Sequence, residues 1–65
     1  MLLIDNKTPT STLLEIKKND LIENEKGVYG RVEKVEINND DAFWLFIFHL
    51  ADGSQIEIKK IKNIC

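Results

Sequence analysis

A run of nine residues, 42–50, constrains the fold of this chain most, because almost nothing in it is polar. It contains the single Trp and all three Phe residues of the sequence, and acidic residues lie just before and just after it. Aromatic and β-branched side chains favour a pleated, packed surface. The run is also too short to cross a membrane as a helix. The sequence therefore predicts a central β-strand here, with the other strands arranged around it.

Both faces of this predicted strand are apolar. Successive side chains of a strand point to opposite faces, which divides the run into two rows. The rows are Ala42, Trp44, Phe46, Phe48 and Leu50 on one face, and Phe43, Leu45, Ile47 and His49 on the other. A small barrel has one interior, and we expect the Trp44 row to fill it. Two alternatives remain for the other row: residues 1–4 or 13–14 cover it, or it is an interface with a partner chain.

Shorter elements are predicted before the central strand. Residues 1–4 are apolar, and they suit a short strand or a segment tucked against the domain. Thr12 and Glu15 fit a capping box, which predicts one or two helical turns, while an extended segment is the equal alternative. Strands are predicted from Leu21 and over residues 28–37. The alternation in the second strand slips near Glu33, which predicts a β-bulge there.

Beyond the central strand, Asp52 and Gly53 form a dipeptide typical of tight hairpins, in which Gly53 takes positive φ in a two-residue turn. Residues 54–59 then alternate between polar and apolar, as a half-buried strand does. Residues 60–65 carry an apolar side chain at every third position. This spacing predicts a 3₁₀ turn leading into a last short strand.

Sixty-five residues form one domain at most. Domains of this size often need a disulfide or a metal for stability. With one Cys and one His, the chain offers neither a disulfide framework nor a zinc site. We therefore expect no metal and no cofactor, and a fold that depends on packing or on oligomerisation.

The predicted strands resemble the SH3-like barrel superfold, especially its KOW and Tudor-type members. The resemblance is carried by residues 16–22, 27–32, the hairpin 44–53, and 56–64. Asn19 stands where these families usually have Gly. The resemblance implies an all-β fold, a small SH3-like barrel of about five antiparallel strands over residues 14–65. Residues 1–13 then form an N-terminal arm and loop, or a short helical turn.

The charge balance and the N-terminus suggest where the protein acts. Nine basic and eleven acidic residues give a net charge of −2, which weighs against nucleic-acid binding. Lys outnumbers Arg eight to one, and Ile and Asn are plentiful, as in an AT-rich bacterial or phage coding sequence. Asp5 interrupts the apolar start, so no signal peptide is predicted. We expect a cytoplasmic protein with no membrane contact.

Three groups of residues are candidate sites. The first is a protein interface built from the outward row with two residues of the preceding strand, namely Phe43, Leu45, Ile47, Val35 and Ile37. The second is an aromatic surface of Tyr29 and Phe43, which in Tudor-type domains holds methylated cations or stacks bases. The third is a basic set suited to phosphate contacts, namely Lys17, Lys18, Arg31, Lys59, Lys60 and Lys62.

The sequence contains no motif that is typical of an enzyme. It lacks a Gly-rich phosphate loop, a nucleophile elbow and a set of metal ligands, so we expect no catalytic residues. The leading hypothesis is a small non-enzymatic binding module that acts through protein–protein contact, as an accessory or inhibitor protein of a bacterium or phage. Its partner is another protein or a second copy of the chain. The alternative is a nucleic-acid-binding barrel of the KOW or Tudor type.

Overall fold

The structure, a computed structural model, describes residues 1–62. Its elements are β1 (Leu2–Ile4), α1 (Thr10–Glu15), β2 (Leu21–Asn24), β3 (Tyr29–Asn39), β4 (Phe43–Leu50) and β5 (Gln55–Ile61). They form one five-stranded sheet in the order β1-β2-β3-β4-β5. The prediction of a small all-β domain is confirmed. β5 continues through Lys60 and Ile61, where the sequence predicted a 3₁₀ turn, and the rest of that prediction, including the last short strand, falls mainly on residues 63–65, outside the described residues.

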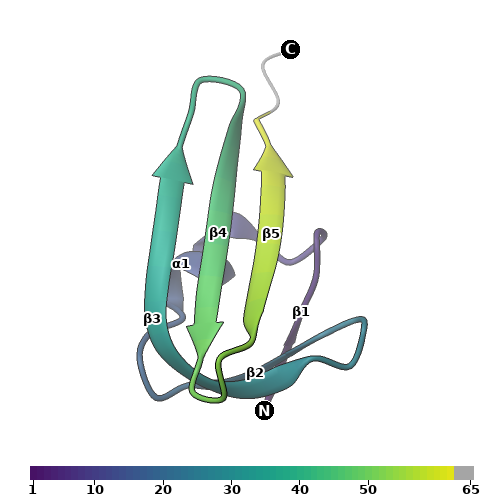
Figure 1. Cartoon of the computed structure of the whole chain (residues 1–65). Helices are drawn as coiled ribbons and strands as arrows, with labels where there is room; N and C mark the ends of the chain where they lie inside the picture. The colour runs from purple at the N-terminus through teal and green to yellow at the C-terminus, as the bar shows by residue number, and fades with distance from the viewer. Residues whose placement is uncertain (63–65) are drawn as a thin grey trace.

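The strands β3, β4 and β5 stand side by side, with α1 and β1 behind them and β2 crossing at the lower end (Figure 1). Pairing from β2 to β5 is antiparallel throughout. β1 differs, because it pairs parallel to β2 with Leu2 opposite Ile22. Parallel neighbours need a long connection between them. The segment that contains α1 provides this connection.

The predicted bulge lies in β3. Val32 is opposite Leu50, and the next pair is Lys34 with His49, so Glu33 has no partner in the ladder. The extra residue shifts the alternation of β3, and Val35 returns to the same face as Val32. β3 bends at this end and passes into its pairing with β2 (Figure 1).

The buried core lies between the Trp44 row and the N-terminal segment. Phe46 and Phe48 are fully buried, and so are Ile4 and Leu13 from the first part of the chain. The other core residues are Ile16, Ile22, Val32, Leu50, Ile56 and Ile58. The N-terminal segment therefore packs on the inner row of β4, and not on the row that contains Phe43.

The helix begins earlier than the capping box predicted. Pro9 is its N-cap, no side chain caps it, and Thr12 lies within the helix. The prediction of a capping box at Thr12 was wrong because the helix already starts after Pro9. The carbonyl of Pro9 accepts hydrogen bonds from the amides of Thr12 and Leu13. Proline suits the start of a helix because its fixed φ is compatible with the first turn.

Three loop residues have left-handed backbone, Asn19, Gly27 and Gly53, and two of them bear on the predictions. Gly53 has φ +94°, as predicted, but the amide of Leu50 donates to the carbonyl of Ser54. The hairpin loop therefore contains three residues, 51–53, rather than two. Asn19 has φ 80° in the turn before β2. Asn tolerates this conformation better than most residues, so the turn does not require Gly at this position.

Candidate functional site

The face of the sheet opposite the core is the candidate site, and we call it the outer surface. Cross-strand partners share a face, so the register defines its members. They are Lys34, Glu36 and Asn38 of β3, Phe43, Leu45, Ile47 and His49 of β4, and Gln55, Glu57, Lys59 and Ile61 of β5. No element of the described chain lies in front of this face in Figure 1.

The apolar centre of the outer surface is the β4 row of Phe43, Leu45 and Ile47. These side chains are half-buried, although none of them belongs to the core cluster or packs against it. Their partial cover comes from neighbours within the sheet. The Nζ atom of Lys59 lies 4.4 Å from the centroid of the Phe43 ring, for example. Ile61, directly opposite Phe43, is 71% exposed and extends the apolar area.

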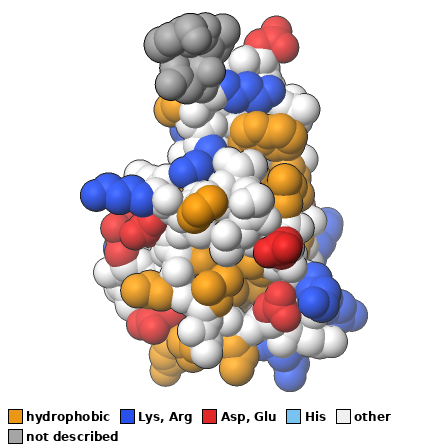
Figure 2. Space-filling view, turned by 180° about the vertical axis from the view of Figure 1, so that it is seen from behind, with side chains coloured by type: hydrophobic (Ala, Val, Ile, Leu, Met, Phe, Trp, Pro, Cys, Tyr) orange, Lys and Arg blue, Asp and Glu red, His pale blue; other side chains and the backbone are white. Residues whose placement is uncertain are grey.

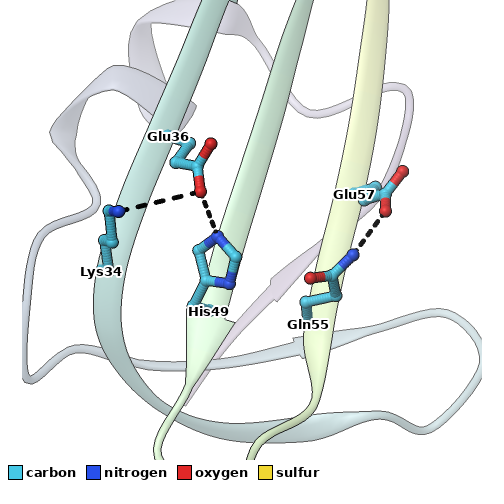
Figure 3. Close-up of polar contacts among 5 residues, drawn as sticks. All are labelled: Lys34, Glu36, His49, Gln55 and Glu57. Atoms are coloured by element: carbon cyan, nitrogen blue, oxygen red, sulfur yellow. Dashed lines mark hydrogen bonds and ion pairs between the residues drawn. The ribbon is translucent and has the colours of Figure 1, made fainter.

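The lower end of the outer surface is polar (Figure 3). His49 Nε2 lies 2.6 Å from Glu36 Oε1, and the same oxygen is 4.0 Å from Lys34 Nζ. On β5 the side-chain amide of Gln55 donates to Glu57 Oε2 at 2.6 Å. The surface therefore changes along β4, from apolar side chains near Phe43 to charged, mutually paired side chains near His49.

Val35 and Ile37 do not join this surface. They lie opposite Phe48 and Phe46, both inner-row residues, because the bulge at Glu33 reverses the alternation on which their outward placement was based. Val35 packs against the core, whereas Ile37 is 42% exposed. Of the five residues predicted to form an interface, only Phe43, Leu45 and Ile47 therefore share the outer surface.

Ile37 belongs instead to a second apolar area, on the inner face where the sheet projects beyond α1 and β1. Hydrophobic side chains are visible there over the upper parts of β3 and β4, seen from behind in Figure 2. Trp44 lies on this face, half-buried, with the Nζ of Lys62 5.0 Å from its ring. Plain alternation along β3 would assign Ile37 to the other face, and only the register shift between Val32 and Lys34 places it in this area.

The predicted aromatic surface is not assembled. Tyr29 is the first residue of β3 and pairs with Glu23, whereas Phe43 begins β4 and pairs with Ile61. Since β3 and β4 are antiparallel, the two rings lie toward opposite ends of the sheet. Tyr29 is 56% exposed at its end. The two do not form one cation-binding or base-stacking platform.

The six basic candidates are also dispersed. Lys59 lies on the outer surface and Lys60 on the inner face of β5, while Lys62 follows the strand with its Nζ over the Trp44 ring. Lys60 Nζ donates to the carbonyl of Asn6, and Lys62 Nζ donates to Asn39 Oδ1, each at 2.6 Å. The remaining three are exposed near the other end of β3: Lys17, Lys18 and Arg31. Basic and acidic side chains are interspersed on the face seen in Figure 2.

Within residues 1–62, no group of three His, Cys, Asp or Glu side chains is placed to hold a metal ion. No pocket opens in that part of the chain either. Among the same residues, no helix has both the length and the apolar character needed to cross a bilayer. The features that the structure does present for binding are surfaces and strand edges.

The chain was compared with known proteins at the levels of family, sequence and structure. No protein-family model, curated protein or solved structure matches it. Function is therefore inferred from the outer surface itself.

Proposed function

We propose that this protein is a small non-enzymatic binding module that acts through protein–protein contact at the apolar row of its outer surface. The observation that carries the proposal is the position of Phe43, Leu45 and Ile47. They are adjacent on a central strand, they stand apart from the core, and no other element of residues 1–62 covers them. Contiguous apolar side chains of this kind are typical of interaction sites.

The surroundings of the row also suit a protein partner. Interfaces commonly combine an apolar centre with a polar, charged rim. Here Lys34, Glu36, Glu57 and Lys59 flank the row on both sides, so charges of both signs border it. A partner with apolar side chains at its centre and mixed charges around them would match this arrangement.

Within the all-β class, we propose that the module has the fold of an SH3-like barrel. The bent β3 and the antiparallel meander from β2 to β5 support it. SH3-like domains serve many unrelated functions, so the fold alone does not specify a partner. An accessory or inhibitor role in a bacterium or phage fits the size and the Lys-rich composition of the chain.

Nucleic-acid binding is the alternative function, and the dispersed lysines lend it little support. A titration with salt distinguishes the two, because phosphate-driven affinity falls steeply as salt concentration rises. We expect no salt-dependent binding to DNA or RNA. Tight binding that weakens steeply with salt would favour the alternative.

The test of the protein interface compares two variants that each introduce a lysine at a partly or fully exposed leucine or isoleucine. Ile47→Lys changes the apolar row, and Leu14→Lys changes a 51% exposed residue of α1 outside the outer surface. Proteins captured from the host are identified by mass spectrometry, and the candidate partner is purified and titrated against each variant.

We expect the purified partner to bind the parent and Leu14→Lys equally and to bind Ile47→Lys at least tenfold more weakly. Circular dichroism melts establish that both variants are folded. Equal affinity of folded Ile47→Lys would overturn the proposed interface.

A further inference from the structure

β5 is the last strand of the sheet, and no strand within residues 1–62 pairs with its outer edge. Its ladder with β4 is unbroken, and the amide of Lys62 donates to the carbonyl of Ala42 at one end of it. At the other end Leu50 donates to Ser54. Antiparallel ladders alternate, so the even-numbered residues of β5 bond to β4. The backbone N–H and C=O groups of the odd-numbered residues face the open edge: Gln55, Glu57, Lys59 and Ile61.

Such an edge is a template for another strand unless something blocks it. β5 is seven residues long, contains no Pro, and shows no register shift against β4. Lysine side chains on an edge strand often prevent another strand from pairing with it, but the ammonium groups of both lysines of β5 have other contacts. Lys59 Nζ lies over the Phe43 ring, and Lys60 Nζ donates to Asn6. Within residues 1–62, the edge of β5 is therefore not protected by a proline, a bulge or an unengaged lysine.

Charge determines which partner strand fits. In a two-fold antiparallel pairing of β5 with itself, centred on Ile58, Glu57 lies opposite Lys59 of the other strand, twice. A pairing centred on Glu57 places Glu57 against Glu57, and one centred on Lys59 places two lysines together. Opposite charges directly across a ladder stabilise it and like charges destabilise it. The sequence of β5 is thus self-complementary in one register.

We propose that β5 pairs antiparallel with β5 of a second copy of this chain, around a two-fold axis at Ile58. The four odd-numbered residues then exchange backbone hydrogen bonds with their counterparts. The two copies then share one continuous sheet. Their outer surfaces lie on the same side of this sheet, rotated relative to each other by its twist. This dimer uses the strand edge, so it does not depend on the proposed interface at the apolar row.

Sedimentation velocity over a concentration series tests the dimer. The parent sediments with twice the chain mass at high concentration. Glu57→Lys and Lys59→Glu each place like charges opposite one another, and each weakens dimerisation at least tenfold. The double variant Glu57→Lys with Lys59→Glu restores it. Glu25→Lys makes the same charge change on an exposed turn and dimerises as the parent does.

Hydrogen exchange supplies a measurement on the parent that needs no variant. In the dimer the backbone amides of Glu57 and Lys59 exchange slowly, and this protection disappears on dilution. A parent that remains monomeric at all concentrations overturns the proposal. So does a dimer in which these two amides exchange fast, because that dimer forms elsewhere, and so does a folded double variant that stays monomeric.

Discussion

Leu13 and Leu14 are adjacent in α1, yet Leu13 is fully buried in the core while Leu14 is 51% exposed. The difference arises because α1 lies against the inner face of the sheet, and successive helical side chains point in different directions. Through Leu13 and Ile4, the first part of the chain contributes to the core.

This pair offers a direct test of the N-terminal packing. Leu13→Ala leaves a cavity and should lower the free energy of unfolding by about 2–5 kcal/mol. Leu14→Ala removes the same atoms from the surface and should change it by only about 0.5 kcal/mol. Urea denaturation of both variants measures the difference. Equal effects would contradict the packing of α1 on the sheet.

Phe46 tests the inner row of β4. It is fully buried, and its ring lies 6.1 Å from that of Trp44 and 6.3 Å from that of Phe48. Phe46→Ala should cost about 3–5 kcal/mol, which a domain this small can hardly tolerate. Thermal melts should show a largely unfolded variant at room temperature. Phe43→Ala, on the outer surface, is the matched control and should remain folded.

Gly53 tests the hairpin loop. A Cβ at this position would meet no atom within 4 Å, so any cost arises from its φ of +94°. A β-branched residue is strained in this region, and Gly53→Val should destabilise the domain by at least about 1–2 kcal/mol. Gly53→Asn should cost clearly less, because Asn tolerates left-handed backbone. Similar thermal midpoints for the two variants would argue against backbone strain as the cause.

Asp52, in the same loop, should make the stability of the fold depend on pH. Hydrogen bonds from Ser54 to the carboxylate lower the pKa of Asp52. The backbone amide of Ser54, at 2.9 Å, has the largest effect, and its side chain the second largest. A lowered pKa in the folded state stabilises the fold at pH values above the ordinary Asp pKa. This stabilisation is lost as pH falls through the lowered value.

Asp52→Asn removes this titration while it keeps an oxygen that can accept from Ser54. The parent should therefore lose stability relative to Asp52→Asn as the solution is acidified below the ordinary Asp pKa. Denaturation of both proteins at a series of pH values measures this, and an NMR titration of the Asp52 carboxyl group reports its pKa directly. A constant difference in stability at all pH values would contradict the role of the carboxylate.

The alternation of the central strand was enough to predict which of its side chains share a face. Phe46, Phe48 and Leu50 are buried as expected, because a strand with period two must place them together. The phase slip at Glu33 predicted the bulge, and the Asp52–Gly53 dipeptide predicted positive φ at Gly53. Each of these features is local, since it depends on residues close together in the sequence.

Long-range contacts decided the rest. Both rows of β4 are apolar, so its sequence alone did not determine which row the N-terminal segment would cover. The parallel pairing of β1 with β2 and the packing of Leu13 decided this, and left Phe43, Leu45 and Ile47 on the open face. The bulge at Glu33 likewise placed Ile37 with Phe46, because one extra residue in β3 reverses every later side chain relative to its partner strand.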